Sequence, residues 1–102
     1  MNGREVTVVR IYITEGEKLM KRLLAKLHDE EQVRGVTVFR GIAGFGRSGV
    51  MHSSQLLDLS LDLPIVIEFF DEPRKVETIL AHLREVVPPG HMVWWSASVS
   101  EA

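Results

Sequence analysis

The alternation of apolar and polar positions predicts four strands and two helices along the chain. Residues 6–13, 36–40, 65–70 and 92–99 are rich in β-branched and aromatic side chains, which is typical of strands. Between the first and second of these segments, and again between the third and fourth, apolar residues recur at spacings of three and four. That period predicts an amphipathic helix in each interval.

Local signals predict where the helices begin and end. Thr14 followed by Glu17 has the capping-box spacing of a helix start, and Gly35 is expected to end that first helix. Asp71 is expected to cap the second helix, with Pro73 in its first turn. Two consecutive prolines and a glycine then end it.

The order strand, helix, strand, strand, helix, strand predicts the α+β class and a ferredoxin-like sandwich. We expect one antiparallel sheet with both helices on one face, in a single domain over residues 1–102. Segment 41–62 is long and begins with several glycines. Its second half carries leucines at every other position from 57 to 63, which predicts an extra short strand after the second strand or an extension of the next one.

The predicted sheet is apolar on both faces, although the helices can cover only one. In the third strand Ile65 and Ile67 alternate with Val66, and in the fourth Trp94 and Trp95 must point to opposite sides. A second apolar face needs a second cover. We expect a closed homo-oligomer that buries this face; the alternative is that the extra strand or a terminal segment folds over it.

Composition excludes several classes of function. The chain has 102 residues, a formal net charge of -2, 45% hydrophobic residues and no cysteine, which excludes disulfides, thiolate metal sites and cysteine nucleophiles. Apolar runs fall short of the ~20 residues of a membrane span, so no membrane insertion is expected. The start of the chain lacks a secretory pattern, which predicts a cytoplasmic protein. Without clustered positive charge, nucleic-acid binding is not expected, and an RNA-recognition domain is a weak alternative.

The glycine-rich segment that follows the second strand is the most informative stretch. Gly44, Gly46 and Gly49 match G-x-G-x-x-G, but a strand-like pattern follows them instead of a helix, so we reject a dinucleotide-binding fold. Glycines allow consecutive backbone N–H groups to form an anion-binding nest. Arg40 and Arg47 flank the segment, and guanidinium groups suit phosphate. The functional interpretation is an anionic ligand; the alternative is a solvated surface loop.

Other polar residues do not form a catalytic or metal-binding pattern. The four histidines, at 28, 52, 82 and 91, lack metal-ligand spacing, and serine, histidine and acid are not arranged for nucleophilic catalysis. We therefore predict no catalytic residue, no metal site and a protein that is not an enzyme. Glu68 lies in an apolar strand and is expected to pair with Arg10 or Arg40 across the sheet.

Two strings carry a family resemblance. Gly-Val-Thr-Val at residues 35–38, followed by Gly-Phe-Gly-Arg at 44–47, resembles the P-II nitrogen-regulatory signal transducers, as does Leu-Pro-Ile-Val-Ile-Glu at 63–68. Over nearly its whole length the chain is identified as a member of the PII-like family of domain of unknown function 190. In that family Arg-Gly-Ile-Ala-Gly-Phe-Gly, here 40–46, and Asp-Leu-Pro-x-Val-Ile-Glu, here 62–68, are typical.

The resemblance implies a homotrimer whose sheets line its centre and an adenine nucleotide bound in clefts between subunits. It places the base near the start of the second strand and the phosphates under the glycine-rich loop. Arg40 has no clear counterpart in the P-II motif, and we include it in the predicted site because of its positive charge. Segment 41–62 is then the ligand-responsive element, and a transporter or an enzyme would be the protein target. The predicted ligand-binding residues are Gly35, Val36, Thr37, Arg40, Gly41, Gly44, Phe45, Gly46 and Arg47.

The chain also departs from the P-II pattern. Those proteins carry a Gly-Asp-Gly-Lys-like phosphate loop before the last strand, where this chain has Pro88-Pro89-Gly90-His91 and no lysine. Fewer cations neutralise a triphosphate less well, so AMP or ADP is predicted over ATP, with no obligatory cofactor. The only tyrosine, Tyr12, lies in a strand, so a loop-tyrosine switch does not carry over. The alternative is a trimeric scaffold or metal-tolerance protein of CutA-like architecture without nucleotide specificity.

Overall fold

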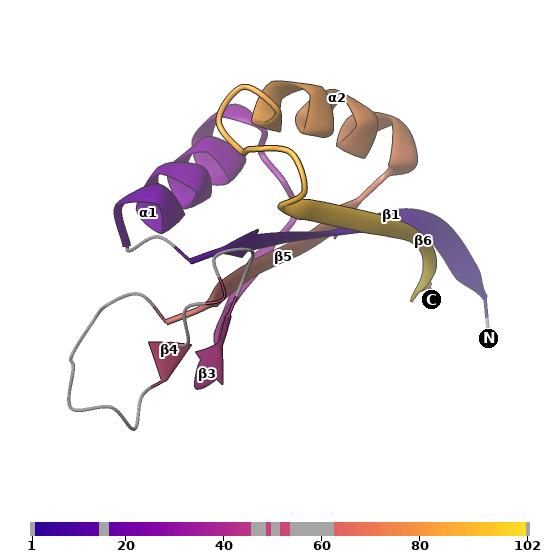
Figure 1. Cartoon of the computed structure of the whole chain (residues 1–102). Helices are drawn as coiled ribbons and strands as arrows, with labels where there is room; N and C mark the ends of the chain where they lie inside the picture. Colours follow the sequence, from indigo (N-terminus) through magenta and orange to yellow (C-terminus); the bar gives the residue numbers. More distant parts are fainter. Residues whose placement is uncertain (1, 15–16, 46–48, 50–51, 54–62, 102) are drawn as a thin grey trace.

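The computed structural model describes residues 2–14, 17–45, 49, 52–53 and 63–101, and it has the predicted α+β fold. Four antiparallel strands form the main sheet in the order β2-β5-β1-β6, and both helices pack on one side of it (Figure 1). The first helix, α1, continues into a short π-helical segment, η1. The bounds are β1 Gly3–Ile13, α1 Glu17–Ala25, η1 Lys26–Glu30, β2 Val36–Arg40, β5 Ile65–Asp71, α2 Pro73–Leu83 and β6 Met92–Ser100.

The segment after β2 contains extra short strands, as predicted, and the two described ones precede the alternating leucines. Strands β3 (Ala43–Gly44) and β4 (His52–Ser53) pair with each other in a separate two-stranded sheet. Residues 54–62, which hold most of the alternating leucines, lie outside the described residues. Because β5 begins at Ile65, Leu63 does not extend that strand.

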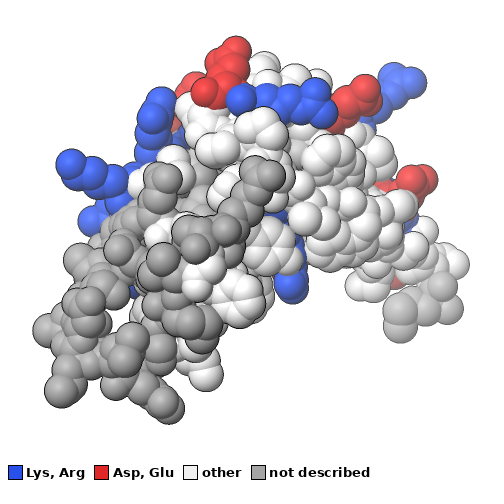
Figure 2. Space-filling model, viewed as in Figure 1, with Lys and Arg blue, Asp and Glu red and all other residues white. Residues whose placement is uncertain are grey.

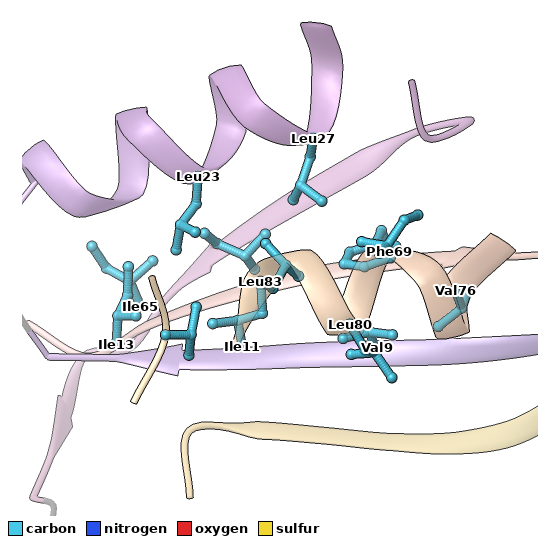
Figure 3. Close-up of a cluster of buried hydrophobic side chains, with 13 residues drawn as sticks. Val9, Ile11, Ile13, Leu23, Leu27, Ile65, Phe69, Val76, Leu80 and Leu83 are labelled. Atoms are coloured by element: carbon cyan, nitrogen blue, oxygen red, sulfur yellow. The ribbon is translucent and has the colours of Figure 1, made fainter. Parts of the chain in front are cut away.

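A single apolar core lies between the helices and the sheet. Alternate residues of β1 and β5 point toward α1, η1 and α2, and their side chains meet there (Figure 3). Burying each such side chain contributes about 1.5–3 kcal/mol relative to leaving it in water. The buried members are Val9, Ile11, Ile13, Leu23, Leu27, Ile65, Ile67, Phe69, Val76, Ile79, Leu80, Leu83 and Val87. Among the described residues no helix is long and apolar enough to cross a membrane.

The expected end of the first helix at Gly35 is wrong. The helical segment ends at Glu30, and Gln32 takes the left-handed conformation, with φ of 52°, where a glycine would be favoured. The cost of this conformation is about 1–2 kcal/mol for a residue with a Cβ. It is offset by the Lys75 ammonium, which donates to the Gln32 carbonyl oxygen at 2.8 Å. A contact from α2 thus fixes a turn that local sequence does not specify.

Asp71 is the last residue of β5 and not the cap of α2, whose cap position is Glu72. The expected Pro73 does open the helix. Asp71 is only 3% exposed; its Oδ1 accepts the Glu72 backbone N–H at 2.8 Å, and its Oδ2 lies 2.9 Å from the Lys75 ammonium. Burial on its own raises the pKa of Asp71, but Lys75 and two backbone N–H groups outweigh it, so that the pKa lies below its usual value of 3.8.

Replacing Asp71 with Asn should lower the free energy of unfolding by about 1–3 kcal/mol near pH 7, because the partly exposed Lys75 ammonium loses the buried carboxylate that pairs with it. Folding lowers the pKa of Asp71, so its carboxylate stabilises the protein fully above the usual pKa. This stabilisation disappears as the pH falls through the lower pKa of the folded protein. Urea unfolding from pH 2 to pH 7 should therefore show the two proteins converging at acid pH. The exposed Glu72 gives a matched control, Glu72→Gln; equal losses in the two variants at pH 7 would contradict the assignment.

Candidate functional site

The face of the sheet away from the helices carries mostly apolar side chains, and several of them are exposed. Both helices lie on the other side of the sheet (Figure 1). Strand register places Val8 between Phe70 and Trp95, and Val66 between Phe39 and Tyr12. Large side chains remain in contact with water on this face; Phe39 is 46% exposed and Trp95 41%. We call this surface the open sheet face; its members are Val8, Arg10, Tyr12, Thr37, Phe39, Val66, Glu68, Phe70, Val93 and Trp95.

An ion pair lies at the centre of the open sheet face. Arg10 donates from Nε to Glu68 Oε1 at 2.7 Å, which confirms the first of the two partners expected for Glu68. The guanidinium lies 5.9 Å from the Phe39 ring centre and 5.8 Å from that of Trp95. The hydrogen bond to Glu68, then one to Tyr12, raises the pKa of Arg10. Because the two charges are paired, this face can be buried without leaving an isolated ion.

Trp94 lies on the opposite side of β6, as predicted for adjacent residues of a strand. It pairs in register with the core residue Val9 and is 47% exposed. Together with the flank of α2 it borders a groove of about 520 Å³. This groove is separate from the open sheet face, so the two tryptophans belong to different surfaces.

A cavity of about 730 Å³ opens where the glycine-rich segment meets the turn before β6. The end of β1, strand β3, the start of β5 and that turn enclose it, and we call it the loop cavity. Gly44 and Phe45 are the predicted ligand-binding residues that line it. The described lining residues are Tyr12, Ile13, Thr14, Ala43, Gly44, Phe45, Pro64, Ile65, Val66, Pro89, Gly90 and His91.

Two of the predicted glycines pack closely against Pro64 at the edge of the loop cavity. The Gly41 N–H donates to the Pro64 carbonyl oxygen at 2.7 Å, so this amide is already hydrogen-bonded within the chain. A Cβ at Gly44 would lie 2.8 Å from Pro64 Cγ, which is too close without a shift of the backbone. These glycines therefore fix how the segment approaches the start of β5.

The turn before β6 reaches the loop cavity because Gly90 and His91 shape it. Gly90 has φ of 89°, in the left-handed region that favours glycine. His91 is tied to the end of β1 twice: its carbonyl oxygen accepts the Tyr12 N–H at 2.8 Å, and its Nδ1 lies 2.8 Å from the Tyr12 carbonyl oxygen. Sequence reasoning noted this turn as the end of the second helix and as a departure from the P-II pattern, but did not include it in the predicted ligand site.

A second cleft, of about 350 Å³, lies at the other end of β2, and we call it the strand-start cleft. Gly35, Val36 and Thr37, which are among the predicted ligand-binding residues, line it. Sequence reasoning missed the remaining lining residues because they come from β5, β6 and the turn before β2. Those residues are Arg34, Glu68, Phe69, Phe70 and Val99.

The structure thus divides the predicted ligand-binding residues between two clefts. The two clefts lie at opposite ends of β2, whose five residues span about 13 Å. Arg40 and Gly41 lie where β2 ends, near the loop cavity but not in its lining, while Gly46 and Arg47 lie outside the described residues. Within one chain, the two sets do not meet in one pocket.

The chemistry of the two clefts differs. The strand-start cleft offers the exposed ring of Phe70, the Thr37 hydroxyl and the Glu68 carboxylate, a combination suited to a flat heterocycle with hydrogen-bond donors. The described lining of the loop cavity includes two residues with polar side chains near its rim, Thr14 with a hydroxyl and His91 with an imidazole. The space-filling view shows lysine and arginine side chains scattered around the described surface (Figure 2).

Metal-binding clusters of three or more His, Cys, Asp or Glu side chains do not occur among the described residues. His82 Nδ1 lies 2.9 Å from Glu31 Oε1, and His28 Nδ1 lies 2.7 Å from Asp29 Oδ1. Both histidines fall in the last turn of their helical segments, as expected for a favourable interaction with the helix dipole. The side chain of His52 is outside the described part of the chain.

Solved structures with the same fold include a PII-like protein and a CutA protein. CPII, a nitrogen regulatory PII-like protein from Thiomonas intermedia K12 bound to ADP, AMP and bicarbonate, matches with a TM-score of 0.72 and 20% identity over 98% of this chain and 92% of that one. The divalent cation tolerance protein CutA1 of Thermus thermophilus matches with a TM-score of 0.62 and 12% identity over 95% and 86%. At these identities the likeness shows a shared fold.

Sequence comparison shows the family directly. A UPF0166 protein of Methanocaldococcus jannaschii is 34% identical over 84 residues, which cover 78% of this chain and 77% of that protein. The profile of the DUF190 family, described as uncharacterized ACR, matches residues 6–99. The chain belongs to the DUF190 family and has a PII-like, ferredoxin-like fold.

Proposed function

We propose that this chain is a PII-like regulatory protein that binds an adenine nucleotide in a site shared by two subunits, with AMP or ADP favoured over ATP. The observation that carries the proposal is the division of the predicted ligand-binding residues between the loop cavity and the strand-start cleft. Each cleft supplies half of a nucleotide site, one for phosphates and one for a base. The ADP and AMP bound to CPII, which shares the fold, support this ligand class.

Assembly into a homotrimer joins the two halves. Three copies with the open sheet faces turned inward bury the exposed aromatic side chains and the Arg10–Glu68 pair together. Cyclic assembly uses two different surfaces of each subunit, so the loop cavity of one copy can face the strand-start cleft of the next. The base then stacks near Phe70 and Thr37, and the phosphates extend toward the loop cavity.

Segment 41–62 is the ligand-responsive element in this proposal. It begins next to the loop cavity, where Gly44 and Phe45 would contact the bound phosphates. A nucleotide shifts such a segment only by binding one of its conformations more tightly than another. The changed surface would then be recognised by a protein target such as a transporter or an enzyme.

A second candidate is a trimeric scaffold or metal-tolerance protein of CutA-like architecture. The fold likeness to the divalent cation tolerance protein of Thermus thermophilus favours it. A thermal-shift panel of AMP, ADP, ATP, cyclic nucleotides and divalent metals separates the two candidates. Under the nucleotide proposal the adenine nucleotides raise the melting temperature, and Arg47→Ala removes that rise; under the alternative only metals act and the variant changes little.

Isothermal titration with AMP, ADP and ATP should show AMP or ADP binding more tightly than ATP. The physical reason is that neither the described lining of the loop cavity nor the Pro-Pro-Gly-His turn supplies a lysine or arginine to neutralise a third phosphate. Titration of all three nucleotides in the same buffer and salt measures the order. If ATP bound tightest, the predicted preference would be wrong.

Replacing Trp95 with Gln should dissociate the trimer, because this side chain lies on the open sheet face. Trp94→Gln is a matched control, since Trp94 has a similar exposure but lies on the helix side of the same strand. Light scattering of both variants at equal concentration measures the mass in solution. A trimer that survives in Trp95→Gln and is lost in Trp94→Gln would contradict the proposed arrangement.

A further inference from the structure

The His91 imidazole is held in a single tautomer by the end of β1. Its Nδ1 lies 2.8 Å from the Tyr12 carbonyl oxygen, and a carbonyl oxygen can only accept a hydrogen bond. Nδ1 therefore carries a hydrogen and donates it. The reciprocal bond from the Tyr12 N–H to the His91 carbonyl oxygen, also 2.8 Å, fixes the backbone that carries the ring.

This tautomer leaves Nε2 as the one polar atom of the His91 ring that can meet a ligand in the loop cavity. In the neutral imidazole Nε2 has a lone pair and only accepts. It therefore repels phosphate or carboxylate oxygens, which also present lone pairs. After protonation Nε2 becomes a donor on a cationic ring, which is the charge-assisted contact that anions favour.

His91 is the only group among the described lining residues of the loop cavity that can become a cation. The other titratable lining residue is Tyr12 on β1, whose neighbour Arg10 is already paired with Glu68. The described lining residues from β3, from the start of β5 and from the prolyl turn carry no other ionisable side chain. Among the described lining residues, protonation of the His91 imidazole is therefore the step that adds a positive charge to this cavity.

We propose that His91 makes a proton-dependent anion contact in the loop cavity, so that binding a phosphate group there takes up one proton at neutral pH. Where the anion is the phosphate of an adenine nucleotide, this rests on the proposed function. The site would then respond to pH as well as to nucleotide. Imidazoles titrate within the physiological range, so the contact would strengthen as the solution becomes more acidic.

Nitrogen-15 NMR of the ligand-free protein tests the first step, because long-range couplings distinguish the two neutral tautomers. At pH 8 His91 should carry its hydrogen on Nδ1. A hydrogen on Nε2 would overturn the inference before any ligand is added. His82→Gln provides the assignment control, because that ring lies on α2 against Glu31 and outside the loop cavity.

Titration of ADP and, separately, of inorganic pyrophosphate at pH 5.5 and 7.5 tests the second step. From pH 5.5 to pH 7.5, the affinity for ADP and for pyrophosphate should fall about tenfold more in wild type than in His91→Lys. The substituted side chain in that variant stays positively charged at both pH values. His91→Gln should bind weakly at both, and His82→Gln should follow wild type; NMR spectra confirm that each variant is folded. Ionisation of the ligand itself changes the affinity equally for every variant, so its effect cancels when the variants are compared.

The two probes separate this inference from the proposed function. If pyrophosphate binds with the His91-dependent slope and ADP does not bind, the anion contact stands and the nucleotide proposal fails. If ADP binds with the same pH slope in wild type and His91→Lys, the nucleotide proposal stands and the His91 contact is overturned. Failure of both probes to bind at pH 5.5 would overturn the contact as well.

Discussion

The four-stranded sheet carries apolar side chains on both faces, while both helices pack on the same face. One face forms the core with residues such as Ile11 and Phe69, and the other leaves Phe39 and Trp95 in water. A chain of this length has little left to cover a second face. Burying that face against other copies removes the exposed apolar surface and pairs each subunit with its neighbours. In this account the ligand site depends on assembly, because its halves lie at opposite ends of β2.

The Arg10–Glu68 pair connects the open sheet face to the strand-start cleft. Arg10 lies between Phe39 and Trp95, where the sheet would meet its neighbours, and Glu68 also lines the strand-start cleft. A base that hydrogen-bonds Glu68 would share that carboxylate with Arg10 at 2.7 Å. In the proposed function, nucleotide binding and trimer assembly would therefore act on the same two charges. At the far end of β2, one backbone and one side-chain hydrogen bond between Tyr12 and His91 hold the turn before β6 beside the loop cavity.

Most of the fold could be predicted from the sequence because hydrophobic period and strand composition specify the six main elements. The end of the first helix was misplaced because the turn at Gln32 is held by Lys75, a residue distant in sequence. Asp71 stays at the end of β5, where it pairs with the same lysine four residues further on. The motif strings located both parts of the candidate site, but they could not show that β2 separates them. The sequence did not single out His91 for the candidate site, because its hydrogen bond to the Tyr12 carbonyl oxygen depends on the pairing of β1 with β6.

Mixing two inactive variants tests the shared site most directly. Gly35→Trp fills the strand-start cleft, where a Cβ has open space, and Ala43→Glu places a negative charge in the loop cavity. Each variant alone should fail to bind ADP. After the two variants are co-refolded in equal amounts, the mixed trimers should recover about a quarter of the wild-type sites in a titration. The reason is that random cyclic assembly joins an intact cleft to an intact cavity at about a quarter of the subunit interfaces. A mixture that binds no more ADP than either variant alone would contradict a site built from two subunits.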